Sequence, residues 1–156
     1  MTTRPMTRDD VPALRRVPRT IELFPADMLP DLAAPYLNGQ GEDVWLTAEA
    51  DGECGHEPIG LLHAVWEEAT DGAWNMRAHG IKADRQRGGH GRALIGALEE
   101  ALRERGGRLL VVDTSDGDAY APARAFYAAN RYREVARVPD FWTDGDTKVV
   151  LTKRLK

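Results

Sequence analysis

A glycine-rich segment, Gln86–Leu94, joins an apolar stretch to an amphipathic one and leaves few folds open to this chain. Glycines at such a junction let the backbone turn sharply and bring its N–H groups together. Those amides, with the N-terminus of the following helix behind them, form a typical anion site. Arg87 and Arg92 add positive charge, and Gln86 adds a neutral donor. The segment predicts a phosphate-binding turn between a strand and a helix, with an ordinary flexible loop as the alternative.

Two common nucleotide-binding loops do not match this segment. A Walker A loop ends in Gly-Lys-Ser or Gly-Lys-Thr, and that ending is missing here. A dinucleotide-binding loop follows the opening strand of a βαβ unit, whereas the stretches before Gln86 are patterned as antiparallel strands. ATP and NAD are therefore disfavoured as ligands.

The residues after the glycines predict a helix and then a buried strand. Leu94, Leu98 and Leu102 recur at i, i+4 and i+8, which is the apolar stripe of an amphipathic helix. A pair of glycines ends this helix, and Leu109–Val112 follows as a continuous apolar run, typical of a strand buried on both faces. The order strand, helix, strand implies a parallel crossover.

The remaining patterns extend this unit into one mixed sheet. After an extended start over Thr3–Met6, antiparallel strands are predicted over Val44–Ala50, Ile59–Trp66 and Ala73–Lys82, and a closing pair over Tyr132–Arg137 and Lys148–Lys153. Helices are predicted from Asp9 to a stop at Pro18, over Asp27–Leu37 and over 121–129. Residues 51–58 are expected to form a long hairpin tip, and residues 139–145, with Phe141 and Trp142, the turn between the last strands. The chain reads as a single α/β domain, 1–156, with about six to seven strands and about four helices.

Charge and composition disfavour some classes of binding partner. The chain has 156 residues, of which 25 are acidic and 21 basic, so its net charge is −4. Broad nucleic-acid binders are usually basic, which disfavours nucleic acid as a partner. No apolar run approaches the ~20 residues that span a bilayer, and no secretory signal is recognisable, so no membrane is expected. We expect a monomer or a homodimer.

The cysteine and histidine pattern favours a protein without metal. Cys54 is the single cysteine and cannot form an internal disulfide, which favours a reducing, cytoplasmic setting. Cys54 and His56, with His63 and His79 as distant partners, fit no common zinc-ligand spacing. We therefore expect no metal site.

Two motifs together resemble those of the GNAT superfamily of N-acetyltransferases. Gln86-x-x-Gly89-x-Gly91 resembles the superfamily's [Arg/Gln]-x-x-Gly-x-[Gly/Ala] loop, and Ala123–Tyr127 looks like its Ala-Arg-x-Phe-Tyr helix. The spacing between the motifs and the order of elements from Val44 onward also match. Arg131 stands where relatives commonly place a glycine after the helix, and Asn130 is the alternative residue for a left-handed position there.

The resemblance implies the GNAT fold, with acetyl-CoA as donor in a V-shaped splay. This splay opens between the strand that ends near Lys82 and the strand Leu109–Asp113. The strand backbone at Ile81 and Ala83 would then bind the pantetheine arm, because a splayed strand has unpaired amide groups. Main-chain amides over seven residues would hold the pyrophosphate, namely Gln86, Arg87, Gly88, Gly89, His90, Gly91 and Arg92.

The resemblance also implies that Tyr127 protonates the departing thiolate of CoA. A phenol with a pKa of ~10 is a plausible acid for a thiolate with a pKa of ~8.5, although helical spacing alone describes Tyr127 as a core aromatic. For the base that deprotonates the amine we consider His79, which shares strand parity with Ile81. Glu67, Glu68, Asp113 and a chain of waters are alternatives.

The resemblance thus predicts an acetyltransferase that moves an acetyl group from acetyl-CoA directly to the amine of a small molecule, amino acid or peptide. No covalent enzyme intermediate is expected, since Cys54 is badly placed as a nucleophile on its presumed hairpin tip. Two alternatives stay open. One is a non-catalytic acyl-CoA-binding or sensor module, and the other is a toxin-type acetyltransferase acting on aminoacyl-tRNA.

Overall fold

The computed structural model describes residues 2–21, 23–53 and 55–156. Its strands and helices follow in the order β1 (Thr2–Pro5), α1 (Val11–Leu14), α2 (Val17–Thr20), α3 (Leu29–Leu37), β2 (Val44–Gly52), β3 (Gly55–Trp66), β4 (Ala73–Ile81), α4 (His90–Glu104), β5 (Leu109–Ser115), α5 (Ala121–Ala129), β6 (Arg133–Thr143) and β7 (Asp146–Arg154). Short 3-10 turns lie at Arg8–Asp10, Ala26–Met28, Ala83–Arg85 and Asp118–Tyr120. Every helix of the described part of the chain is too short or too polar to cross a membrane.

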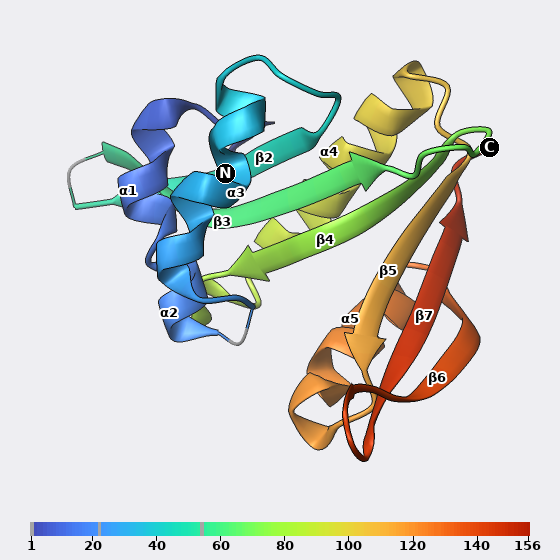
Figure 1. The fold of residues 1–156 in the computed structure, drawn as a ribbon. Helices are drawn as coiled ribbons and strands as arrows, with labels where there is room; N and C mark the ends of the chain where they lie inside the picture. The colour runs from blue at the N-terminus through green and yellow to red at the C-terminus, as the bar shows by residue number, and fades with distance from the viewer. Residues whose placement is uncertain (1, 22, 54) are drawn as a thin grey trace.

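The strands form one seven-stranded mixed sheet in the order β1-β2-β3-β4-β5-β7-β6, which confirms the predicted α/β class (Figure 1). Neighbouring strands are antiparallel except β4 and β5, which are parallel. The parallel pairing joins Ala73–Met76 to Leu109–Val112 and goes no further, while β4 continues to Ile81 and β5 to Ser115. The two strands therefore diverge, as the expected V-shaped splay requires.

Two apolar clusters cover the two faces of β2 and β3. On one face the stripe of α4, made of Leu94, Leu98 and Leu102, is fully buried against Leu46 and Leu62. Burying one leucine side chain stabilises the fold by about 1.5–3 kcal/mol relative to leaving it exposed. The other face is covered by residues of α1 to α3, which pack with Trp45 and Leu61 in a separate cluster. Successive residues of a strand point to opposite faces, so neighbours such as Leu61 and Leu62 serve different clusters.

Two predicted boundaries were wrong in detail. The segment around Pro18 breaks into two single turns, α1 and α2, and Pro18 lies in the first turn of α2, where proline is tolerated. The first hairpin has no long tip, because β2 and β3 pair as far as Gly52 opposite Gly55. Cys54, which was placed on that tip, lies outside the described residues.

The end of the chain differs from the prediction at the last turn. β7 lies between β5 and β6, an order that the sequence left open. β6 extends to Thr143, which places Phe141 and Trp142 on the strand and not in the turn. The register between β6 and β7 jumps after Val138, and Asp140 within this irregular stretch has φ 55°. The ladder is therefore interrupted by a bulge just before the turn at residues 144–145.

Arg131 takes the left-handed position after α5, with φ 69°, and Asn130 does not. The N–H of Tyr132 donates to the carbonyl of Tyr127 at 3.0 Å, the 6→1 bond that closes a helix whose next residue is left-handed. Asn130 instead donates its side-chain amide to the carbonyl of Phe126 at 2.8 Å. The left-handed backbone costs an arginine about 1–2 kcal/mol, which this closure offsets.

Candidate active site

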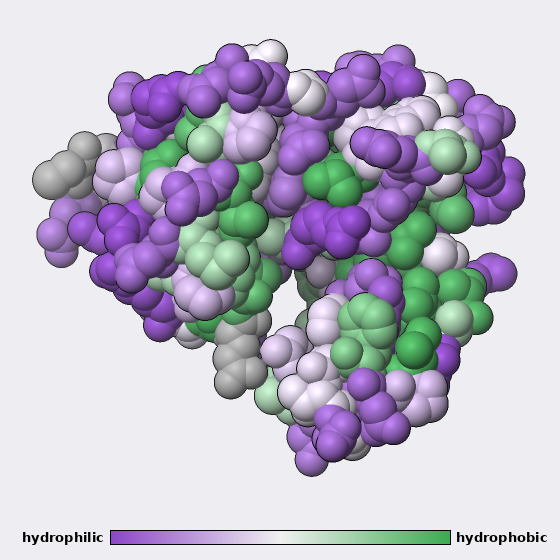
Figure 2. Space-filling model, viewed as in Figure 1, coloured by the Kyte–Doolittle hydropathy of each residue, from purple (hydrophilic) through white to green (hydrophobic). Residues whose placement is uncertain are grey.

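A cleft of about 400 Å³ lies where β4 and β5 diverge, and we call it the β4–β5 cleft. Its lining includes Met76 and His79 of β4, Asp113 and Ser115 of β5, Tyr127 of α5 and Asp146 of β7. Figure 2 shows the molecule hollowed between the part that carries β4 and the part that carries β5 and β7. The splay of two parallel strands thus opens a site at the carboxyl ends of both.

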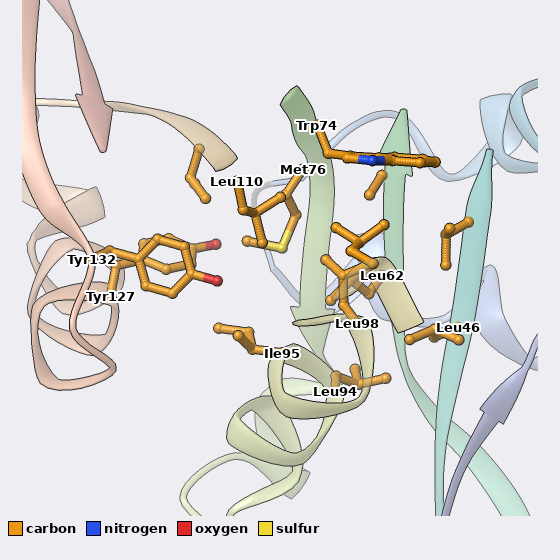
Figure 3. Close-up of a cluster of buried hydrophobic side chains, with 14 of the residues drawn as sticks. Leu46, Leu62, Trp74, Met76, Leu94, Ile95, Leu98, Leu110, Tyr127 and Tyr132 are labelled. Atoms are coloured by element: carbon orange, nitrogen blue, oxygen red, sulfur yellow. The ribbon is translucent and has the colours of Figure 1, made fainter. Parts of the chain in front are cut away.

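Helix α5 places Tyr127 at this cleft. The side chain is 7% exposed and packs edge-to-face against Phe126 and Tyr132, with ring centroids 5.5 Å apart in both pairs. In Figure 3 the hydroxyl groups of Tyr127 and Tyr132 point toward the side on which Met76 lies. Burial raises the pKa of Tyr127, so its hydroxyl keeps its proton and is a hydrogen-bond donor at neutral pH.

His79 contacts the hydroxyl of Tyr127 from β4. Its Nδ1 lies 3.4 Å from that hydroxyl, and its Nε2 lies 3.2 Å from the carbonyl oxygen of Gly91 in the first turn of α4. Burial lowers the pKa of His79 to about 4, and only the bond to Gly91 opposes this shift. The imidazole is therefore neutral at pH 7. A carbonyl can only accept, so Nε2 carries the single proton and Nδ1 accepts from Tyr127.

The structure brings two of the four predicted base candidates to the cleft. His79 and Asp113 line it, and Asp113 is ion-paired with Nζ of Lys148 at 3.0 Å. Glu67 instead faces Arg77, with 3.5 Å between the charged atoms, and is not among the lining residues. Glu68 is exposed and also lies outside the lining.

Sequence reasoning missed Asp146 and placed Trp142 only in the turn between the last strands. Oδ1 of Asp146 accepts a hydrogen bond from Oγ of Ser115 at 2.5 Å, and Nε1 of Trp142 donates to the carbonyl of Thr114 at 3.2 Å. Both side chains line the β4–β5 cleft. In the sequence, Asp146 lies two residues before Lys148, so the two side chains point to the same face of a strand. This spacing indicates that Asp146 lies at the cleft only when β7 is known to pair with β5.

The glycine-rich segment forms the expected turn before α4. Gly89 is the N-cap of α4 with φ 80°, and Arg87 also has a left-handed φ of 65°. No side chain caps this helix end, so the first amides of the helix are left for another partner. A Cβ at Gly89 would meet nothing within 4 Å, so the space in front of these amides is open. A 15-residue helix with free amides and open space at its N-terminus suits a phosphate.

The other predicted cofactor residues surround this turn. Arg87 and Arg92 are exposed and form no ion pair with any residue that the structure describes. The side-chain amide of Gln86 donates to the carbonyl of Ile81 at 3.2 Å, so it holds the end of β4. Ala83 lies after the strand, in a 3-10 turn, and its N–H donates to Oγ1 of Thr20 at 3.1 Å. Only the carbonyl of Ala83 is left for a ligand.

Two of the histidines that were weighed against zinc-ligand spacing are paired with single carboxylates. His63 bonds Asp43 at 2.7 Å, and His56 lies 3.1 Å from Asp51. Within residues 2–21, 23–53 and 55–156, no group of three or more His, Cys, Asp or Glu side chains could hold a metal ion. Cys54 lies outside that set.

A second cavity, of about 530 Å³, lies at the far end of the sheet. Trp66, Trp74 and Arg105 are among its lining residues, and Arg105 marks the C-terminal end of α4. The glycine-rich turn and Tyr127 do not line it. The β4–β5 cleft is smaller but combines a buried hydroxyl donor, a histidine and two carboxylates, so we take it as the candidate active site.

Comparisons with known proteins agree with this geometry. The model of the acetyltransferase (GNAT) family matches residues 10–131. The structure is similar to that of a Desulfovibrio desulfuricans protein assigned to the GNAT family of acetyltransferases, with a TM-score of 0.88, 28% identity and 99% of each chain covered. No curated protein matches the chain.

Two more distant structures share the fold. One is an aminoglycoside 6'-N-acetyltransferase complexed with coenzyme A, with a TM-score of 0.75, 16% identity, and 100% of this chain and 98% of that chain covered. The other is the ribosomal-protein-S18-alanine N-acetyltransferase of Escherichia coli, with a TM-score of 0.77, 17% identity, and coverage of 99% and 94%.

Proposed function

The chain belongs to the acetyltransferase (GNAT) family, and we propose on that premise that it moves an acetyl group from acetyl-CoA directly to a primary amine. Members of this family are acetyl-CoA-dependent N-acetyltransferases, so the donor follows from the family. The observation that carries the finer proposal is the β4–β5 cleft. There a buried tyrosine hydroxyl and two carboxylates share one cavity of about 400 Å³.

The residues present fit the donor. The uncapped first turn of α4 and the unpaired side chains of Arg87 and Arg92 support binding of the pyrophosphate over Gln86–Arg92. Beyond Met76, β4 has left β5, so its backbone from Arg77 to Ile81 can bond the amides of a pantetheine arm. When bound, acetyl-CoA supplies an activated acyl group as a thioester.

We assign the leaving-group acid to Tyr127. As the neutral amine nitrogen bonds to the acyl carbon and the bond from carbon to sulfur breaks, Tyr127 donates its proton or a hydrogen bond to the sulfur. The proton that the nitrogen gives up passes through water and restores the hydroxyl of Tyr127 where that has been used. Burial raises the pKa of the hydroxyl, but the same low dielectric raises that of a thiolate beside it. The pKa of the tyrosine hydroxyl and that of the thiol therefore differ by less than the raised pKa of Tyr127 alone suggests.

The acceptor is a cationic amine in our proposal. Asp146 forms no ion pair with any described residue, and it lines the same cleft as Trp142. Asp113 has its charge compensated by Lys148, which leaves Asp146 as the better partner for an ammonium group. The base stays a prediction among His79, Asp113 and a chain of waters, and a cytoplasmic setting and a monomeric or homodimeric state also stay predictions.

A turnover screen tests the proposal. Acetyl-CoA is incubated with amino acids, polyamines, aminoglycosides and peptides with N-terminal alanine, and both free thiol and acetylated product are measured. We expect product with at least one primary amine, and Asp146→Asn should raise KM for it while Asp144→Asn, in the neighbouring turn, should not. CoA binding without any product would favour the sensor alternative, and product with aminoacyl-tRNA alone would favour the toxin-type alternative.

A further inference from the structure

His79 connects the first turn of α4 to the hydroxyl of Tyr127. The two ends of the link are the 3.2 Å contact from Nε2 to the carbonyl of Gly91 and the 3.4 Å contact from Nδ1 to Tyr127. Gly91 belongs to the turn that is expected to hold the pyrophosphate, whereas Tyr127 lies on α5. One side chain of β4 thus touches both halves of the proposed donor site.

Packing holds the imidazole in this position. Its ring centroid lies 5.4 Å from that of Phe126 and 6.1 Å from that of Tyr127. A Cβ on Gly91 would lie 3.4 Å from Phe126 and 3.5 Å from His79, which is ordinary van der Waals contact, so these three residues are neighbours. The ring contacts and the Gly91 carbonyl together place the imidazole between α5 and the first turn of α4.

Both ring nitrogens are engaged inside the protein. The carbonyl of Gly91 accepts only, which assigns the proton to Nε2 and leaves Nδ1 as the acceptor for the hydroxyl of Tyr127. A general base needs a free lone pair directed at the incoming amine, and here the lone pair is directed at the tyrosine. The contacts therefore favour a role through Tyr127 over direct deprotonation of the acceptor.

Resting on the acetyltransferase function proposed above, we propose that His79 is a positioning residue that holds the hydroxyl of Tyr127 at the diverging ends of β4 and β5 before the reaction. The hydroxyl has a single proton, which turns from Nδ1 of His79 to the sulfur as the thiolate forms. The carbonyl of Gly91 fixes the tautomer that makes this possible. Because Gly91 lies in the first turn of α4, the same contact ties the position of the acid to the turn that faces the phosphates. Loss of the link lowers turnover and leaves the phosphate site intact.

Two substitutions separate the two contacts. His79→Gln places an amide near Nε2 and can still donate to Gly91, but it offers no acceptor to Tyr127. His79→Asn places an oxygen near Nδ1 and keeps an acceptor for Tyr127, but it loses the bond to Gly91. We expect kcat to fall about tenfold in His79→Gln, with KM for acetyl-CoA unchanged, and to fall less in His79→Asn.

A double-mutant cycle gives the decisive readout. If His79 acts through Tyr127, adding His79→Gln to Tyr127→Phe should cause no further loss of kcat, because the hydroxyl it positions is gone. Losses that multiply would overturn the proposal. So would a loss in His79→Asn that equals or exceeds the loss in His79→Gln.

Nitrogen NMR of the folded protein tests the link without activity. Long-range correlation spectra of the histidine ring should show a bare Nδ1 and a protonated Nε2 at His79, and protonated Nδ1 would overturn the proposal. Should the wild-type protein turn over no amine at all, the proposed function fails. The tautomer result then still decides whether His79 holds Tyr127.

Discussion

Replacing Tyr127 by phenylalanine removes one hydroxyl and leaves the aromatic ring in its packing. Among the residues that the structure describes, the hydroxyl has one hydrogen-bond partner, Nδ1 of His79 at 3.4 Å, which is long for a hydrogen bond. Its loss should cost less than about 1 kcal/mol of unfolding free energy. If the hydroxyl serves the leaving sulfur, turnover should fall about 10²-fold, which corresponds to ~2.7 kcal/mol of transition-state stabilisation. The catalytic effect should therefore exceed the structural one.

The assay combines initial rates, calorimetry and melting. With an acceptor from the turnover screen, kcat and kcat/KM should fall together in Tyr127→Phe, because the lost interaction belongs to the transition state. CoA affinity by calorimetry and the melting temperature should stay close to the wild-type values. Some activity should remain, since a thiolate also leaves unaided.

Tyr132 offers a matched control, because it is a second buried tyrosine whose ring lies against that of Tyr127. Its hydroxyl donates to Oε1 of Glu99 at 3.0 Å, and Glu99 also binds Lys153 at 2.7 Å. Tyr132→Phe removes a hydrogen bond to a buried carboxylate and should cost about 1.5–3 kcal/mol of stability with little change in kcat. Wild-type turnover in Tyr127→Phe, or losses of activity that follow stability in both variants, would refute the role of Tyr127.

Three further predictions concern the donor site and pH. Gly89→Asp should weaken CoA binding by about tenfold or more, whereas Gly89→Asn, which also tolerates φ 80°, should bind CoA nearly normally. Gly96→Asp, on an exposed face of α4, is the calorimetric control. Equal CoA affinities in the Gly89→Asp and wild-type proteins would exclude this loop as the phosphate site. CoA should raise the melting temperature more than ATP or NAD at equal concentration, and a larger shift with NAD would revive dinucleotide binding. The pKa of His79 is about 4 in the folded protein and 6.5 in the unfolded chain. Between these pH values the unfolded chain binds one more proton than the folded protein, so the free energy of unfolding falls as the pH falls from 6.5 to about 4. This loss is at most about 3 kcal/mol, and denaturant titrations of His79→Gln should show a flatter pH profile than the wild type; parallel profiles would contradict it.

Local patterns in the sequence were sufficient for most elements and for the glycine-rich turn before α4. The stripe of Leu94, Leu98 and Leu102 predicts α4 because the period of a helix follows from its backbone geometry alone. The turn at Gly89 is local as well, since it depends on residues able to adopt a positive φ. Tyr127 was found because a motif of consecutive residues sets its register on α5.

The ends of strands and the positions of turns were harder to predict from the sequence, because pairing with another strand extends or shortens an element. β2 and β3 stay paired as far as Gly52 and Gly55, although the range 51–58 contains aspartate, glycine and proline, which are typical of turns. Trp142 was read as part of a turn, yet β6 continues past it to Thr143, which pairs with Asp146 of β7 beyond the bulge. A favourable partner strand outweighs weak local preference.

Strand order and the acceptor side of the cleft were decided by the tertiary structure. Backbone hydrogen bonds are the same for every sequence, so no local pattern says that β7 lies between β5 and β6. Only that placement brings Asp146 beside Ser115 and into the cleft with Tyr127. The tautomer of His79 is likewise set by Gly91 and Tyr127, which come from two different helices. Sequence determines which groups are available, and long-range burial and pairing determine which of them meet.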